Sequence, residues 1–240
     1  MDKPQVNDEN APKSNRESYP PSYASVVTNQ PTPGFEPTVY THLTSPMAGI
    51  DILRNLDYLS IERSASIRQA FQDNFMMERY KILDNQSQVL YKVQRKLKLE
   101  FICRQYTFQC LDQYENDVLH LERNIYVRGV FLVDQDIKVI IPPNIHLGTI
   151  EWARMGIFSP QFSVKDAQGN LLFLINSQLN HSCCARIVFT IEENKAPIGK
   201  IQYKNMYKTE CQFSVHLTTV QKALLCGATM LILNVIYERK

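Results

Sequence analysis

The sequence predicts a mainly β protein, a closed antiparallel β-barrel around a hydrophobic C-terminal helix. Short strand-like runs alternate with polar turns about every 8 to 12 residues, a pattern typical of a sandwich or barrel. One dense apolar segment, 223–237, follows the last of these runs. A closed barrel has no open edge strand and needs a filled interior. A barrel that encloses its own C-terminal helix would meet both needs.

The chain begins with a proline-rich tail, residues 1–45, ahead of the barrel domain, 46–240. Eight of the twelve prolines lie before residue 47, among many Asn, Ser and Thr residues. Such a composition cannot bury enough apolar surface to offset the entropy of ordering, so we expect this tail to be disordered. The tail does not begin with an apolar run, so no secretory signal peptide is expected.

The tail contains the motif Pro20-Pro21-Ser22-Tyr23, which matches the PPxY pattern recognised by WW domains. An extended polyproline II segment presents Pro20, Pro21 and Tyr23 to an aromatic groove at a low entropy cost. The motif predicts a WW-domain partner, although four residues in a proline-rich linker also arise by chance.

The strand-like runs of the domain follow one another as hairpins. After a mixed opening stretch, 49–71, YKIL and VLYKV flank the turn DNQSQ, and YTFQCL and VLHLE flank DQYEND. Further on, IKVII and IHLGTIEW flank Pro-Pro-Asn, FSV and LLFLI flank KDAQGN, and ARIVFTI and IGKIQY flank Glu-Glu-Asn. The shared form of these hairpins suggests a weak internal repeat.

The C-terminal segment, which we expect to be helical over 217–238, has two possible environments. A bilayer core is spanned by about 20 apolar residues, whereas a run of about 10 to 14 is more often a buried core helix. The apolar run 223–237 falls between these lengths and includes Asn234. Because it is apolar on all sides, it must be covered on all sides. The length favours burial inside the protein, and a membrane span is the alternative.

Composition excludes several classes of function. The net charge of +2 provides no field for nucleic acid, so no nucleic-acid partner is expected. We find no phosphate-binding loop, dinucleotide fingerprint or nucleophile elbow, and no catalytic constellation. The histidines are scattered without metal-type spacing, at positions His42, His120, His146, His181 and His216.

Two further features suggest contact with a membrane. The adjacent Cys183 and Cys184 are either two small residues in a strand or turn, or a site of S-acylation. Lys92, Lys96 and Lys98 recur at even spacing, which places them on one face of a strand. That face is either simply solvated or in contact with anionic lipid headgroups.

A series of motifs follows one fixed order along residues 46 to 238. They are Gly49 to Leu53, Arg79-Tyr80-Lys81-Ile82, Leu121-Glu122-Arg123, Pro142-Pro143 with Gly148 and Trp152, Phe162-Ser163-Val164, and Ile198 to Ile201. The apolar C-terminal segment adds Lys222-Ala223, Gly227-Ala228 and Leu231-Ile232. In this order, the motifs resemble those of the phospholipid scramblase family.

The resemblance implies a Tubby-like barrel of twelve strands around a C-terminal helix. It also implies ATP-independent, bidirectional movement of phospholipids between the leaflets of the plasma membrane, under calcium control, with the terminal helix, including Lys222, Ala223, Gly227, Ala228, Leu231 and Ile232, as the membrane element. The chain would then lie at the cytoplasmic face, or in the cytosol if its helix fills the barrel.

The sequence departs from the family at two places. The cysteine-rich run that is regarded as the palmitoylation site is replaced by 124–132, which contains no cysteine. The acidic calcium segment is reduced to Asn205, Thr209 and Glu210, with Lys208 among them. Calcium requires six to eight oxygen ligands, several of them carboxylates, so we expect its binding to be weak or lost.

Two functions therefore follow from the sequence. One is a membrane-associated scramblase-family protein that moves phospholipids, with doubtful dependence on calcium. The other is a membrane-peripheral or cytosolic adaptor that does not scramble lipids and recruits WW-domain proteins through its tail.

Overall fold

The computed structural model describes residues 47–64, 79–99, 103–128, 132–155, 159–178 and 187–237. The chain divides into two units, residues 1–42 and Leu43–Lys240. All of the described residues belong to the second unit, which is compact. The PPxY motif and the Cys183-Cys184 pair lie outside the described residues, so they stay predictions.

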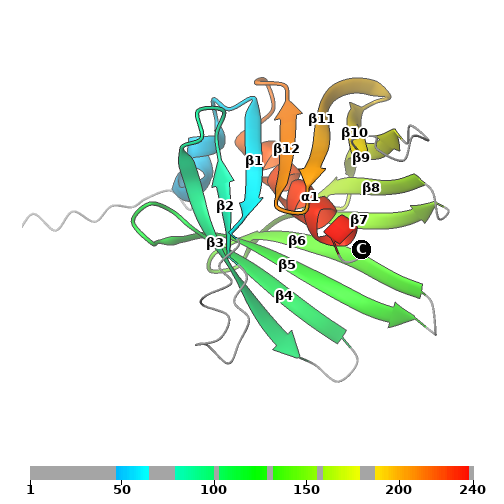
Figure 1. The fold of residues 1–240 in the computed structure, drawn as a ribbon, viewed down its shortest axis with the longest axis horizontal. Helices are drawn as coiled ribbons and strands as arrows, with labels where there is room; N and C mark the ends of the chain where they lie inside the picture. The colour runs from blue at the N-terminus through cyan, green and yellow to red at the C-terminus, as the bar shows by residue number, and fades with distance from the viewer. Residues whose placement is uncertain are drawn as a thin grey trace, which may run out of the picture. The chain divides into compact units, whose positions relative to one another are not determined.

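The second unit is a closed barrel of twelve strands, preceded by a short 3-10 helix and followed by one long α-helix (Figure 1). Each strand pairs antiparallel with its neighbours in sequence, and β1 pairs with β12 to close the barrel. The predicted fold is therefore confirmed. The elements are η1 Ala48–Leu53, β1 Tyr58–Arg63, β2 Arg79–Leu83, β3 Val89–Leu99, β4 Cys103–Leu111, β5 Asp117–Arg128, β6 Leu132–Ile141, β7 Ile145–Met155, β8 Ser159–Asp166, β9 Leu171–Gln178, β10 Ile187–Glu193, β11 Ala196–Asn205, β12 Lys208–Phe213 and α1 Thr219–Tyr237.

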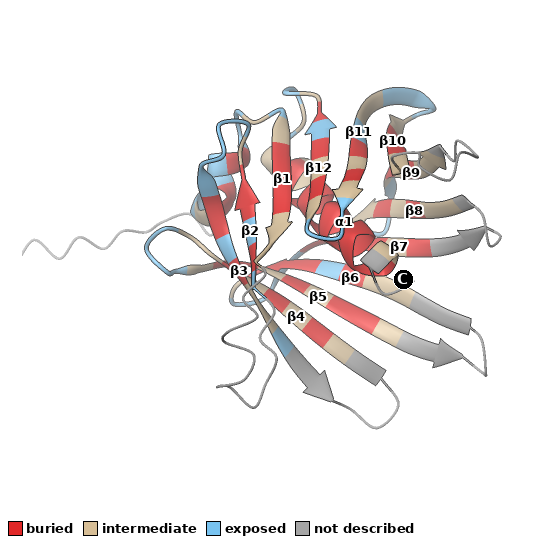
Figure 2. Cartoon of the chain, viewed as in Figure 1, coloured by how far each residue is buried: buried red, intermediate tan, exposed pale blue. Residues whose placement is uncertain are grey.

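The strands alternate between the barrel interior and solvent, as a two-residue period requires. On β2, Tyr80 and Ile82 are buried whereas Arg79 and Lys81 are exposed. Figure 2 shows the same alternation of buried and exposed bands along the strands, together with a helix that is buried along most of its length. The alternation of apolar and polar residues in the sequence therefore specifies which face of each strand is inside.

The helix α1 runs through the interior of the barrel (Figure 1). It packs against β6, β7 and β8 as well as β1, β11 and β12, so it meets the wall on several sides. Its residues from 222 to 235 are buried without exception. By length and composition the helix could cross a bilayer, but 83% of its 18-residue apolar window is buried inside the protein. Of the two environments that the sequence left open, the structure therefore has the helix inside the barrel.

Lys222 holds α1 in place at the end of the barrel where the helix begins. The ammonium group of Lys222, which is fully buried, donates hydrogen bonds to the backbone carbonyls of Arg54 and Val215. It also lies 5.9 Å from the ring centroid of Phe213. Burial lowers the pKa of Lys222, although the charge of Asp57 acts in the opposite direction. Lys222 therefore ties the first turn of α1 to the end of η1.

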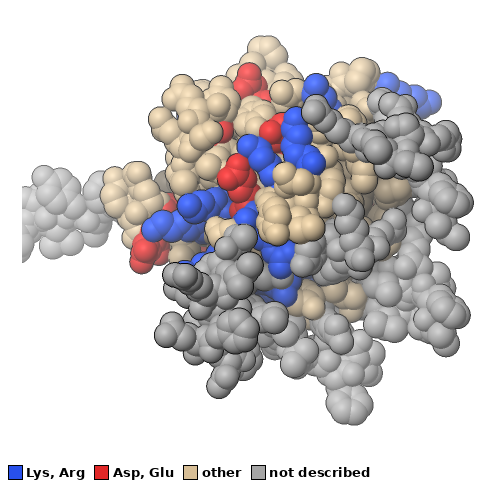
Figure 3. All heavy atoms as spheres, viewed as in Figure 1, with Lys and Arg blue, Asp and Glu red and all other residues tan. Residues whose placement is uncertain are grey.

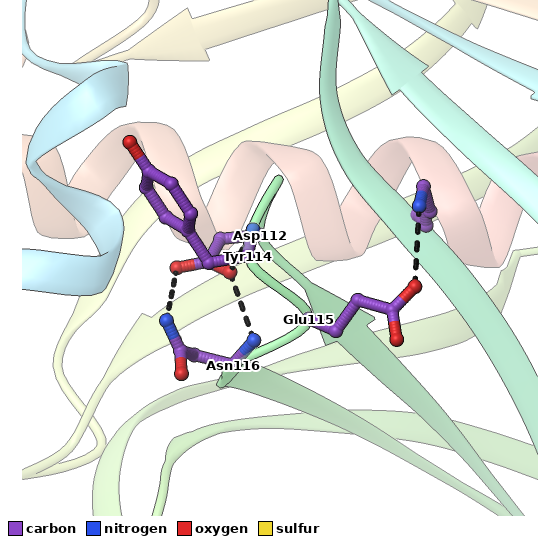
Figure 4. Close-up of polar contacts among 5 residues, drawn as sticks. Asp112, Tyr114, Glu115 and Asn116 are labelled. Atoms are coloured by element: carbon purple, nitrogen blue, oxygen red, sulfur yellow. Dashed lines mark hydrogen bonds and ion pairs between the residues drawn. The ribbon is translucent and has the colours of Figure 1, made fainter.

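Three hairpins at this same end share one turn of five residues, which begins at Asp84, Asp112 or Asp166. In each turn, one carboxylate oxygen accepts backbone N–H groups two and four residues further on. Figure 4 shows the second of these turns, in which the side chain of Asn116 also donates to Asp112 over 2.9 Å. The residue before the last adopts a positive φ, which in the third turn is provided by Gly169. The repeat of hairpins suggested by the sequence is a repeat of this turn.

Candidate functional site

The most distinctive surface of the described chain is a strip of basic side chains on the outside of five adjacent strands, β11, β12, β1, β2 and β3. We call this strip the basic face. Figure 3 shows a band of basic side chains, with a few acidic ones between them, across the side of the molecule on which these strands lie. The outward-pointing charges are Lys200, Lys204, Lys208, Arg79, Lys81, Lys92 and Lys96, against Glu62 and Glu210.

The strand register sets the order of these charges. Glu62 on β1 lies between Lys208 on β12 and Lys81 on β2, and Lys81 lies opposite Lys92 on β3. Two like charges directly opposite each other on neighbouring strands are destabilising. Lys92 is relieved in part by Glu115, at 3.4 Å. The face therefore contains a repulsive lysine pair that an anionic ligand would relieve.

The acidic residues of the basic face are already engaged. Lys208 lies 3.0 Å from Glu62 and 3.7 Å from Glu210, and Lys204 lies 3.1 Å from Glu210. The hydrogen bond to Glu62 raises the pKa of Lys208, against a smaller opposing effect of burial. Within the described part of the chain, no ion pair involves Lys81, Lys96 or Lys200. The face is thus basic after its internal pairs are counted.

The three residues that remain of the family's calcium segment, Asn205, Thr209 and Glu210, do not converge. Thr209 points into the barrel and is fully buried, whereas Glu210 points outward into its two ion pairs with lysine. Asn205 uses its side-chain oxygen to accept the backbone N–H of Tyr207, at 2.8 Å. The residues of this segment therefore do not fit a calcium ion, which needs several carboxylate oxygens around one point. Among the described residues, no group of three or more His, Cys, Asp or Glu side chains could hold a metal ion.

The six helix residues predicted as the membrane element lie within the barrel instead of on a free surface. Lys222, Ala223, Ala228, Leu231 and Ile232 are fully buried. At the remaining position, Gly227, an added Cβ would lie 2.9 Å from Val139 Cγ2 and 3.1 Å from Ile150 Cδ1. Gly227 therefore serves the packing of α1 against β6 and β7, and the other five residues are enclosed with the helix.

The sequence interpretation missed two groups of surface residues. The first group is Lys81, Lys204 and Lys208. Lys81 lies beside Lys92 because β2 and β3 form a hairpin. Lys204 and Lys208 join the same face because β1 pairs with β12 and closes the barrel. The second group is the tip of the β11–β12 hairpin, where Met206 and Tyr207 are 40% and 47% exposed. A signal was present in the sequence, since two lysines flank this apolar pair, but the segment was compared only with a calcium site.

The chain was compared with known proteins in three ways. The family model described as Scramblase matches residues 37–239. Comparisons with curated proteins and with solved structures give no match. The family match covers most of the chain and the whole barrel with its helix, and it implies interaction with phospholipid and association with membranes. On this evidence, the chain belongs to the scramblase family.

Proposed function

We propose that this chain is a membrane-peripheral scramblase-family protein that binds anionic phospholipid headgroups through its basic face while α1 stays inside the barrel. The observation that supports the proposal most directly is the enclosure of α1 by a closed barrel. The outside of the barrel is therefore the part that meets a membrane.

The energetics of the helix support a peripheral mode. Burial of one large apolar side chain contributes about 1.5 to 3 kcal/mol relative to exposure. Transfer of α1 to a bilayer would open the barrel, whose inner wall includes the fully buried Phe108, Phe162, Phe173 and Phe189. The lipid would replace the contacts of the helix but not those of the emptied wall. Insertion of α1 therefore costs more than its own hydropathy suggests.

The electrostatics of the basic face suit a weak, reversible attachment. A lysine near an anionic leaflet contributes about 1 kcal/mol, and the contribution falls off within a Debye length of about 8 Å at physiological salt. Several lysines on one strip add to this attraction, whereas the net charge of the whole chain is only +2. Binding is therefore expected to be stronger on vesicles with phosphatidylserine than on neutral vesicles, and to weaken with salt.

The test is cosedimentation of the full chain with vesicles of phosphatidylcholine and about one third phosphatidylserine. We expect Lys81→Gln combined with Lys96→Gln to weaken binding severalfold and to reduce its salt dependence. The matched control is Lys138→Gln combined with Lys195→Gln, which removes the same charge from β6 and from the β10–β11 turn. Equal losses in both double variants would reduce the effect to net charge and overturn the role of the basic face.

Transbilayer lipid movement is the second candidate function, and family membership favours it. It is tested with a fluorescent phospholipid in vesicles that contain the purified chain, with and without millimolar calcium. We expect no movement in either condition while α1 is enclosed, since α1 is the one helix among the described residues that is long and apolar enough to span a bilayer. Movement without calcium would indicate a scramblase without that control, and movement that calcium stimulates would indicate a calcium site elsewhere in the chain.

The tail and the cysteine pair extend the peripheral proposal. Pro20, Pro21 and Tyr23 precede the matched family region, 37–239, and would recruit a WW-domain protein to the cytoplasmic face of the plasma membrane. Binding of a tail peptide to a WW domain should be lost on Tyr23→Ala. Acylation of Cys183 or Cys184 would supply a second attachment signal, which hydroxylamine treatment would remove.

A further inference from the structure

We propose that the tip of the β11–β12 hairpin, Met206 with Tyr207, inserts into the headgroup region of an anionic membrane and anchors the barrel there without calcium. This inference rests on the proposed membrane attachment and adds the site and orientation of contact. The tip joins Asn205, the last residue of β11, to Lys208, the first residue of β12.

The composition of the tip suits the boundary between water and lipid. Met206 and Tyr207 are 40% and 47% exposed, so both side chains present apolar area to solvent. Tyrosine has an apolar ring with a polar end and is enriched at membrane interfaces. The flanking Lys204 and Lys208 can extend their aliphatic stems along the lipid, while their ammonium groups pair with Glu62 and Glu210. The attraction to anionic lipid therefore comes from the lysines of the basic face that have no ion pair among the described residues, Lys81, Lys96 and Lys200, and the tip adds apolar contact at one end of that face.

The backbone of the tip is held before any ligand arrives. The side-chain oxygen of Asn205 accepts the N–H of Tyr207 over 2.8 Å, and the carbonyl of Tyr207 accepts the N–H of Arg63 over 2.7 Å. These two bonds fix the turn without using the side chains of Met206 or Tyr207. Insertion of a preformed tip requires little further ordering, which favours binding.

The tip is distinct from the other exposed apolar side chains of the described residues. Those others lie at the end of the barrel where η1 and the aspartate turns are found, and they are Ile52, Val89, Tyr114, Ile145, Leu171 and Val215. Tyr114 is 75% exposed but lies between two acidic residues, Asp112 and Glu115, of which, within the described part of the chain, only Glu115 is paired with a lysine, Lys92 at 3.4 Å. An anionic membrane would repel that turn and attract the tip at the opposite end.

The tip also explains the departure from the family's calcium segment. In that segment, Lys204 and Lys208 both pair with Glu210, so fixed positive charges surround the one carboxylate of the strand. In a calcium-dependent protein, the bound ion would supply positive charge between the protein and the headgroups. In this chain, lysine side chains already supply positive charge on that surface. Calcium should therefore not be required for attachment.

The test compares one double variant at the tip with one single control variant. Binding of the full chain is measured on vesicles that contain about one third phosphatidylserine, in buffer with a calcium chelator. We expect Met206→Ser combined with Tyr207→Ser to weaken binding about tenfold, because two partly exposed apolar side chains are lost. The control Tyr114→Ser, which removes a more exposed aromatic ring, should change binding by less than about twofold. Thermal unfolding of each variant establishes that the barrel is intact.

A second readout places the tip in the bilayer. Trp152, the one tryptophan of the chain, is buried in the barrel, so a new tryptophan at Tyr207 can be followed against a protected background. Brominated acyl chains should quench Tyr207→Trp in anionic vesicles and leave Tyr114→Trp unquenched. Wild-type binding with no effect of the tip variants, or quenching at Tyr114→Trp alone, would overturn this inference but not the attachment by the basic face. Failure of the wild-type chain to bind would overturn both.

Discussion

The hydroxyl group of Tyr80 on β2 donates a hydrogen bond to Oδ1 of Asn234 on α1, over 3.2 Å. Nδ2 of the same asparagine donates to the carbonyl of Met230 over 2.8 Å. Asn234 is the amide that interrupts the apolar C-terminal segment in the sequence. A polar group without partners is costly in lipid, whereas here the barrel wall supplies the partner. The pair thus places the C-terminal half of α1 inside the barrel.

Removal of this bond should destabilise the fold. Tyr80→Phe keeps the ring, which meets Phe108 edge to face at 5.7 Å, but leaves Oδ1 of buried Asn234 without its tyrosine donor. We expect the free energy of unfolding to fall by about 1 to 2 kcal/mol in chemical denaturation. Tyr114→Phe is the control, since the Tyr114 side chain is largely exposed. Equal stability of the two variants would speak against the enclosed helix.

The packing of Gly227 separates a barrel-filling helix from a lipid-facing one. Any larger side chain there meets Val139 on β6 and Ile150 on β7. Gly227→Leu should therefore lower the free energy of unfolding by about 1 to 3 kcal/mol, because the core is overpacked. Gly227→Ala should cost less, since alanine favours helix by about 1 kcal/mol over glycine and only side-chain atoms must shift. A stabilised leucine variant would instead indicate a helix that faces lipid, where leucine is favoured.

The aspartate turns predict a dependence of stability on pH. In the third turn, the hydrogen bond from the Asn170 side chain, together with backbone donors, lowers the pKa of Asp166. The ionised group therefore stabilises the fold above the unfolded pKa of about 3.9, and this stabilisation is lost as the pH falls through the lower folded value. Asp166→Ala should be less stable than wild type at pH 7, and the gap should shrink below about pH 4. A gap that is unchanged down to pH 2.5 would contradict the role of the carboxylate.

The buried thiols should be inert in the native chain. Burial raises the pKa of Cys226 to about 12. Burial also raises the pKa of Cys211 to about 12, against a smaller lowering effect of its hydrogen bond with Thr229. Alkylation requires the thiolate, so iodoacetamide at pH 8 should modify these two residues far more slowly in the folded chain than in denaturant. Peptide mass spectrometry measures each cysteine separately. Rapid native labelling of Cys226 would show that α1 leaves the barrel.

The fold could be predicted because its causes are local. Alternation such as Arg79 to Ile82 identifies both a strand and its inner face, and the aspartate turns separate the strands. The apolar segment around Asn234 showed that a helix had to be covered, but length alone could not decide between lipid and protein. The decision depends on long-range contacts such as the bond from Tyr80, 154 positions away.

The candidate site was harder to predict because it depends on register. The opposite orientations of Thr209 and Glu210 follow from the two-residue period of a strand, so they could be predicted from the sequence, and weak or lost calcium binding stays a prediction. The proximity of Lys208 to Glu62 could not be predicted, because it requires barrel closure between β1 and β12. The basic face thus combines residues that are far apart in the sequence, from β2 and β3 near the start of the domain and from β11 and β12 near its end.

Hydrogen–deuterium exchange of α1 in the full chain, prepared without detergent, tests the central claim most directly. Measurements are made on the free protein and on protein bound to anionic vesicles and then released by salt. We predict strong protection of residues 223–235 in both samples, since these amides exchange only when the barrel opens. Rapid exchange of α1 in the free protein, or protein that salt cannot release from vesicles, would contradict a helix that remains inside the barrel.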